Sequence, residues 1–441
     1  MSPADASTHK RKASSPEATA NDNHEPKKPR TEAADGQHAE DCEDPSCEGC
    51  AEGEVVLQFD TKPSAVELFQ MAREEVAGSK PGSGESAGMS RMAKALFDKA
   101  LEEFEVLDKA DAHIDLKDGS DAAAKALEIK LQHAACMVAV GNAMPSSEML
   151  QEGTRMFEEL DKKMEHQNGS VLVGLGIAAI SQARDMRKQA MKTLTLDEDD
   201  DDDEPSEEQR EAAALISKSE AKLADHAVQA FDSGLALLMK TKIDSYAQES
   251  IRAAQELEEY GVSLDLRLNA DLARKVFDAA AKHLEHVQST NSDLISLNAD
   301  VLTIYGSCLY SKAKLVDNQN QGEQNPATTF VEKAISLLSK AEELQDESSD
   351  AKTLEALGQA YLMSTNLVED EDVIMERFDA ATEKLSRALE LDPYNDVLRE
   401  QVDALQGSDN EEGNGYEDEY EDAEDENDED DEGVSAGEDE A

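Results

Sequence analysis

The chain has 441 residues, of which 100 are Asp or Glu and 42 are Lys or Arg, giving a formal net charge of -58. Nucleic acids and anionic membranes are bound through clustered Lys and Arg, so this charge disfavours both as direct ligands and favours basic proteins. Trp is absent, strong helix formers dominate the middle, and no run reaches the roughly 18 apolar residues of a membrane helix. We therefore expect an all-α, soluble, intracellular protein.

The N-terminal residues 1–53 contain few large apolar side chains, and we expect them to form a disordered tail. Two basic clusters interrupt this tail, Lys10, Arg11 and Lys12 and then Lys27, Lys28 and Arg30. Such paired clusters have the form of a bipartite nuclear import signal, which an import receptor binds. The spacer is slightly long for that motif, so the second cluster is expected to act alone if the pair does not. The prediction is a nuclear protein, and the alternative is a random basic patch.

The same tail contains four residues with a spacing that zinc ligands can have, namely His38, Cys42, Cys47 and Cys50. No apolar residues nearby would build a small fold around the ion, so thiols in a flexible tail are the favoured interpretation. Cys136 and Cys308 lie in apolar helical surroundings and should be buried, reduced thiols. The cysteines therefore predict neither a disulfide framework nor a metal site.

A helical-repeat domain is expected over residues 64–406. Its first helix should begin at Ser64, which forms a capping box with Glu67, and should end at the Gly/Ser/Pro run 78–88. Apolar residues at helical spacing then predict further helices over 90–112, 121–143, 147–166, 171–195, 208–240, 243–260, 264–289, 293–316, 327–345, 350–367 and 374–406. Paired helices without strands between them indicate an αα-solenoid.

Three charged or polar segments interrupt or follow these helices. Residues 197–208 contain ten acidic residues and one Pro, and should form a solvated loop. Residues 317–326 are a polar insertion before the next helix. The tail 407–441 contains nineteen acidic residues and no Lys or Arg, so we expect it to be disordered and extended by its own charge.

Near the C-terminus the helices follow the tetratricopeptide pattern, in which large residues of one helix interlock with small residues of the next. The first-helix positions are Leu354, Leu357, Gly358 and Tyr361, and the second-helix positions are Ala381, Leu385, Ala388 and Pro393. About eleven extra residues, centred on 367–372, separate the two halves. The preceding unit repeats the pattern with Leu302, Tyr305, Gly306 and Leu309, then Ala334, Leu338 and Ala341. These residues are expected to pack between helices, with a protein partner bound on a concave face or in a groove.

Other candidate sites are weak. His283 and His286 lie one turn apart and are a possible metal pair, but surface histidines on an acidic helix explain them adequately. The fragment Gly174-Leu175-Gly176 lacks the third glycine and the preceding strand of a dinucleotide loop. Phosphate-binding glycine-lysine motifs and catalytic signatures are missing. The sequence therefore predicts a non-enzyme without a cofactor.

Residues 300–405 resemble the fungal enhancer-of-translation-termination family, through DVLTIYGSCLYSKAKL at 300–315, AISLLSKAEEL at 334–344 and the unit at 348–392. The remainder of the chain matches that family in its architecture only, and a long acidic C-terminal tail is not part of the family pattern. The resemblance implies an irregular tetratricopeptide-like protein of the nucleus. It further implies binding to a prolyl-hydroxylase-like 2-oxoglutarate oxygenase, restraint of that enzyme, and effects on hypoxic gene expression and translation termination.

An alternative interpretation places the chain in another functional class. Nuclear histone chaperones related to the nuclear autoantigenic sperm protein also carry tetratricopeptide repeats interrupted by acidic insertions. The acidic segments 197–208 and 407–441 would suit basic histones. Identification of the bound protein distinguishes the two.

Overall fold

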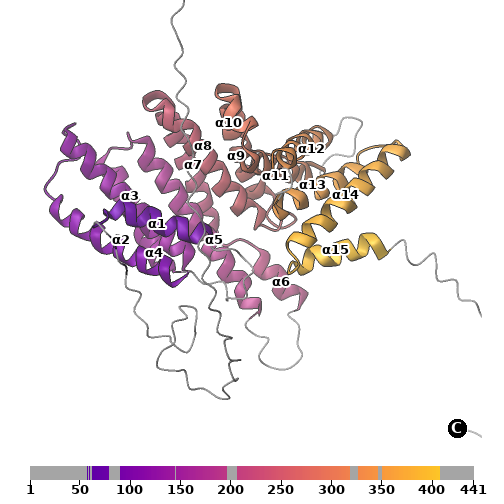
Figure 1. Ribbon diagram of the computed structural model, residues 1–441, viewed down its shortest axis with the longest axis horizontal. Coiled ribbons are helices and arrows are strands. Elements are labelled where there is room, and N and C mark those ends of the chain that lie inside the picture. The colour runs from indigo at the N-terminus through magenta and orange to yellow at the C-terminus, as the bar shows by residue number, and fades with distance from the viewer. Residues whose placement is uncertain are drawn as a thin grey trace, which may run out of the picture. The chain divides into compact units, whose positions relative to one another are not determined.

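Helices account for all of the regular secondary structure in the described part of the chain, which confirms the prediction of an all-α fold (Figure 1). The computed structural model describes residues 57, 59, 62–78, 90–144, 146–195, 206–317, 326–345 and 350–407. All of these belong to the second of two units, Leu57–Ala441. The N-terminal basic clusters and cysteines, the acidic residues 197–205 and the tail beyond Gly407 lie outside the described residues.

The elements in chain order are α1 (Ala65–Gly78), α2 (Arg91–Ala110), α3 (Asp121–Ala143), α4 (Ser147–Lys163), α5 (Gly169–Thr195), α6 (Glu207–Ala214), α7 (Lys218–Thr241), α8 (Ile243–Val262), α9 (Ala270–Thr290), α10 (Ser292–Ser296), α11 (Ala299–Asp317), α12 (Pro326–Gln345), α13 (Ala351–Thr365), α14 (Glu371–Leu391) and α15 (Asp396–Gly407). Among the described residues, no helix is both long and apolar enough to cross a membrane.

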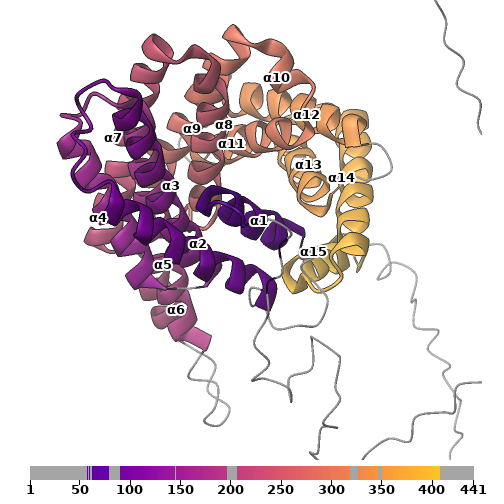
Figure 2. The ribbon, with the colours of Figure 1, turned by 60° about the vertical axis from the view of Figure 1, so that its left-hand side comes forward.

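The helices pack mainly as sequential pairs. The closest pairs are α1 with α2, α3 with α4, α5 with α7, α8 with α9, α11 with α12, and α13 with α14, and each pair also contacts the next. Figure 2 shows α1 lying beside α2 and α3, in agreement with these contacts. The prediction of a helical-repeat architecture is therefore confirmed.

Glycines allow the paired helices to approach each other closely. A Cβ atom placed on Gly306 of α11 would lie 2.5 Å from Cγ of Leu338 on α12, and one on Gly174 of α5 would lie 2.2 Å from the ring of Phe157 on α4. Gly176 faces Phe231 and Gly261 faces Phe277 in the same way. Large side chains thus fill the space that the glycines leave, and each fully buried one stabilises the fold by about 1.5–3 kcal/mol.

The first helix begins as the sequence predicts. The backbone N–H of Ser64 donates to Glu67 Oε2 at 2.7 Å, and the N–H of Glu67 donates to Ser64 Oγ at 3.3 Å. This reciprocal capping box satisfies two of the donors that have no partner within the helix.

Four of the predicted helix spans are wrong in their extent. Residues 208–240 form two helices, α6 and α7, because Ser217 caps α7 through a second capping box with Glu220. The span 264–289 begins as a helix only at Ala270, 293–316 divides into α10 and α11, and 374–406 divides into α14 and α15. The acidic span 197–208 is also too long, since Ser206 caps α6 and Glu207 already belongs to it.

Candidate functional site

The C-terminal repeat residues lie mostly inside the helical pair. Leu354, Leu357 and Gly358 of α13 are buried, as are Ala381, Leu385 and Ala388 of α14. A Cβ atom on Gly358 would lie 2.6 Å from Cγ of Leu385, which repeats the approach of Gly306 to Leu338 one unit earlier. These residues build the repeat and leave no opening for a ligand between them.

Two members of that predicted set are placed differently. Tyr361 is only half-buried, and it packs beside Leu338, Leu357 and Ala360 at the junction with α12. Pro393 is exposed, so its assignment to repeat packing is wrong. It lies in the turn between α14 and α15, where no helix covers it, and its carbonyl accepts a hydrogen bond from Arg399.

The histidines proposed as a possible metal pair are not both on the surface. His283 is buried at 3% exposure, which corrects the expectation of a surface position, and burial lowers its pKa to about 4. His286 is half-buried against Tyr246, with Nε2 3.1 Å from Met239 Sδ. Within the described ranges, no group of three or more His, Cys, Asp or Glu side chains could hold a metal ion.

The two helical cysteines are buried and free, as expected from their surroundings. Burial raises the pKa of the Cys136 thiol to about 12 and raises that of Cys308 well above its ordinary value. Reactive cysteines need a lowered pKa and access to solvent. These two thiols are therefore part of the core.

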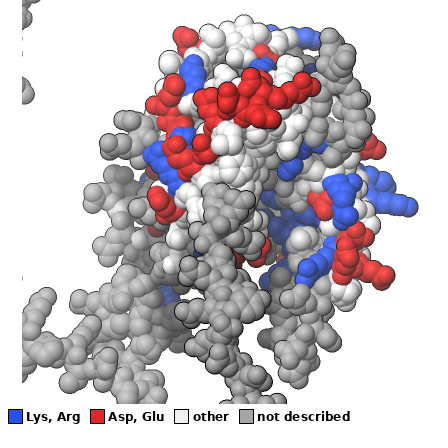
Figure 3. All heavy atoms as spheres, turned by 90° about the vertical axis from the view of Figure 1, so that its right-hand side faces the viewer, with Lys and Arg blue, Asp and Glu red and all other residues white. Residues whose placement is uncertain are grey.

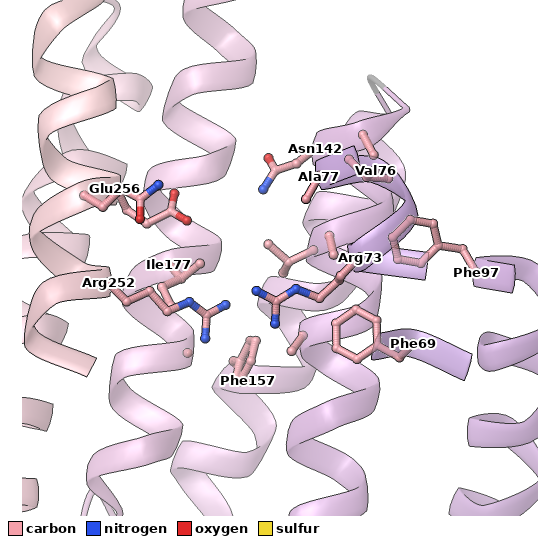
Figure 4. A pocket seen from close by; sticks show the side chains of 16 residues that line it. Phe69, Arg73, Val76, Ala77, Phe97, Asn142, Phe157, Ile177, Arg252 and Glu256 are labelled. Atoms are coloured by element: carbon pink, nitrogen blue, oxygen red, sulfur yellow. The ribbon is translucent and has the colours of Figure 1, made fainter. Parts of the chain in front are cut away.

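A pocket of about 450 Å³ opens between α1 and α8 and is the candidate site (Figure 4). Helices α1 and α8 do not pack on each other, and α3, α4 and α5 form the floor between them. The volume lies in the range of pockets that bind small molecules or individual side chains.

Two arginines face each other across this pocket. Figure 4 shows Arg73 of α1 and Arg252 of α8 pointing toward one another from opposite walls. In the described part of the chain, neither guanidinium forms an ion pair. The nearest pocket carboxylate, Glu256, is already bound at 2.5 Å by Arg184, which also contacts Glu259 at 2.8 Å.

The charges that line the pocket favour the binding of an anion. The Arg73 side chain is exposed at the surface, but desolvation of its guanidinium beside the pocket lowers its pKa. The neighbouring charge of Arg252 lowers this pKa further, whereas Glu256 acts in the opposite direction. Arginine nevertheless stays protonated at neutral pH, so two positive charges oppose one another. A carboxylate between them would remove this repulsion and accept hydrogen bonds from both.

Apolar side chains form much of the pocket lining beside the two arginines. Phe69, Phe97 and Phe157 contribute aromatic rings, and each of these side chains is at most 5% exposed. The guanidinium carbon of Arg73 lies 5.9 Å from the centre of the Phe69 ring. The arrangement can hold an apolar side chain on the floor and a neighbouring carboxylate at the arginines. Glu256 is a carboxylate of the described lining, and it is already paired with Arg184.

The sequence analysis did not identify this pocket. Arg73 and Arg252 belong to helices far apart in the chain, and no short motif joins them. The sequence indicates only that Lys and Arg are scarce relative to Asp and Glu, and this does not show which of them lie close together in the fold. Only the packing of α1 against α2 and α3 brings Arg73 opposite Arg252.

Comparison with known proteins identifies the following similarities. Residues 263–410 match the model of the plant specific mitochondrial import receptor subunit TOM20. A solved structure of the S. pombe nuclear import adaptor Nro1 is 11% identical, with a TM-score of 0.48, and the match covers 80% of this chain and 100% of that one. A structure of a circular tandem repeat protein is 15% identical, with a TM-score of 0.32, covering 78% of this chain and 74% of that one. The search of curated proteins finds no match.

Proposed function

We propose that this chain is a non-catalytic nuclear adaptor that binds a protein partner through the Arg73–Arg252 pocket. The observation that carries the proposal is the pair of arginines beside the Phe157 floor. Neither Arg73 nor Arg252 has an ion-pair partner among the described residues. A partner segment with a carboxylate next to a large apolar side chain would satisfy both parts of the pocket. Arrays of paired helices commonly present such protein-binding surfaces.

In its more specific form, the proposal is that the partner is a prolyl-hydroxylase-like 2-oxoglutarate oxygenase, which the adaptor restrains. Through that enzyme it would affect hypoxic gene expression and translation termination. The resemblance of residues 300–405 to the enhancer-of-translation-termination family supports this choice, and the basic clusters of the N-terminal tail support a nuclear location. An import receptor would be a second partner, bound by those clusters.

The test is affinity purification of the tagged full chain from nuclear extract, with the bound proteins identified by mass spectrometry. Wild type should recover the oxygenase, and the variant Arg73→Glu/Arg252→Glu should lose it. Lys222→Glu/Lys240→Glu is the matched control, because it makes the same charge change at two exposed lysines of α7 outside the pocket. Equal recovery by the pocket variant would show that the partner binds elsewhere.

An acidic tetratricopeptide-repeat histone chaperone is the second candidate. One face of α14 carries exposed Asp372, Glu376, Asp379 and Glu383, three or four residues apart. Figure 3 views the side of the molecule on which α14 lies, and acidic side chains gather there. Such a stripe would suit a basic partner. Recovery of core histones in place of an oxygenase would favour this candidate.

A further inference from the structure

The pocket sets two requirements for whatever fills it. The opposed guanidiniums of Arg73 and Arg252 require negative charge, and the aromatic floor around Phe157 requires an apolar or aromatic side chain. Asn142 adds an amide at the edge, whose nitrogen already donates to Ser181 Oγ at 3.0 Å and whose oxygen can accept a hydrogen bond. A purely acidic segment would satisfy only the first requirement.

The acidic C-terminal segment meets both requirements and offers aromatic rings for the floor. Residues 408–441 hold nineteen acidic residues and no Lys or Arg, and their aromatic residues are Tyr416 and Tyr420. Both tyrosines lie in the run Tyr-Glu-Asp-Glu-Tyr-Glu-Asp at 416–422, so each has carboxylates beside it. The other strongly acidic run, 197–204, follows Leu196 but contains no aromatic residue, so only the tail can place a ring on Phe157.

We propose that residues 416–422 bind the Arg73–Arg252 pocket of the same chain and compete there with the partner. This inference rests on the proposed function of the pocket and adds its regulation. One tyrosine would lie on the Phe157 floor, and its acidic neighbours would accept hydrogen bonds from the two guanidiniums. The partner segment would have the same chemistry, because it occupies the same place.

Because the tail belongs to the same chain as the pocket, even a weak contact between them would fill a large share of the pockets. Tyr416 and Tyr420 follow Gly407, the last residue of α15, by nine and thirteen residues. At about 3.3–3.6 Å per residue, these linkers reach at most about 30 Å and about 45 Å. Where a linker of this length spans the two sites, the effective concentration is of the order of millimolar. A tail with millimolar intrinsic affinity would thus occupy a large fraction of the pockets.

Photo-crosslinking of the full chain tests the proposal. Benzoylphenylalanine replaces Tyr420, and the crosslinked residues are identified by mass spectrometry. We expect crosslinks to the lining of the pocket on α1, α4 or α8. The equilibrium constant for this contact should fall about tenfold in Arg73→Glu/Arg252→Glu, which corresponds to about 1.4 kcal/mol, and the crosslinking yield should fall severalfold with it. The yield should not change in the control Lys222→Glu/Lys240→Glu, and circular dichroism should show that all variants keep their helices.

Three results would overturn the proposal. The first is crosslinks that map outside the pocket, and the second is an equal crosslinking yield in Arg73→Glu/Arg252→Glu. In a mixture of isotopically heavy and light chains, crosslinks joining a heavy chain to a light one would assign the pocket to the tail of a second copy.

A second variant separates this inference from the proposed function. Tyr416→Ser/Tyr420→Ser keeps every carboxylate and removes the aromatic rings, so it should raise partner recovery from nuclear extract severalfold. Pocket crosslinks in a chain that recovers no partner would uphold the tail contact and contradict the adaptor function. Partner recovery that depends on Arg73 and Arg252 but is unchanged in Tyr416→Ser/Tyr420→Ser would uphold the adaptor function and contradict the tail contact.

Discussion

Gly358 lies where a side chain would have no room, since a Cβ atom at this position would be 2.6 Å from Cγ of Leu385. We predict that Gly358→Ala destabilises the protein by about 1–3 kcal/mol, the usual cost of overpacking a filled interface. Gly407→Ala is the matched control, because nothing lies within 4 Å of that position. Urea denaturation measures both, and equal free energies of unfolding for the two variants would contradict close packing at Gly358.

His283 should make stability depend on pH. Its folded pKa of about 4 is below the value of about 6.5 in the unfolded chain, so the unfolded state binds more protons between these values. Stability from the neutral imidazole is present above about pH 6.5 and is lost as the pH falls toward about 4. The carboxylate of Asp232, with Oδ1 3.7 Å from His283 Nε2, raises the pKa of this histidine and so opposes the effect of burial. The charges of Lys282 and His286 lower the pKa and act in the same direction as burial.

The corresponding measurement is the free energy of unfolding at pH 7 and pH 5 for wild type and for His283→Phe. Wild type should lose about 2 kcal/mol more than the variant over this interval, as the two pKa values require. The variant is the reference because both proteins contain the same carboxylates. Parallel pH profiles would show that His283 is not buried as a neutral group.

At the scale of elements, α6 is held by hydrogen bonds and not by a packed face. None of its residues is buried. Arg187 of α5 donates to the carbonyls of Ala213, Ala214 and Leu215 at 2.8, 3.0 and 3.1 Å, and its guanidinium also pairs with buried Glu220 of α7 at 2.6 Å. Tyr260 of α8 donates to the same carboxylate at 3.1 Å.

This network predicts a large and specific loss of stability. Arg187→Met would leave Glu220 buried without its cation, which typically costs about 3–5 kcal/mol. Arg187→Met/Glu220→Met should recover part of that loss, because the buried charge is gone while the carbonyls at the end of α6 and the hydroxyl of Tyr260 still lack their partners. Denaturant unfolding compares the two. A single variant within about 1 kcal/mol of wild type would mean that the pair does not stabilise the α5–α7 junction.

The sequence was informative where one element determines its own structure. The helical periodicity predicted the all-α class, and the Ser64–Glu67 spacing predicted the start of α1, since both depend on neighbouring residues. The division between α6 and α7 was missed although Ser217 and Glu220 have the same capping-box spacing. What could not be read from neighbouring residues is that Arg187, distant in sequence, satisfies the carbonyls at the end of α6. The candidate site was missed for the same reason, since Arg73 and Arg252 meet only through the packing of other helices.

At the scale of the whole molecule, Asp and Glu far outnumber Lys and Arg, giving a net charge of -58, so a dense cluster of basic residues is unusual in this chain. The densest run is predicted to act as an import signal. Changing Lys10, Arg11, Lys12, Lys27, Lys28 and Arg30 to Ala should leave a folded protein in the cytoplasm, because no other run has comparable positive density. Fluorescence microscopy of the tagged chain checks this, with Lys222→Glu/Lys240→Glu as a control. Nuclear accumulation of the substituted protein would contradict it.

The central claim is that the opposed arginines bind the partner, and the dissociation constant of the purified complex tests it most directly. Isothermal titration of the partner should give an affinity at least about tenfold weaker for Arg73→Glu/Arg252→Glu than for wild type, since two charge-assisted contacts become repulsive. The control Lys222→Glu/Lys240→Glu should bind within about twofold of wild type, because rim and distant charges contribute little at moderate salt. Equal dissociation constants for the pocket variant and the control would contradict the assignment of the pocket.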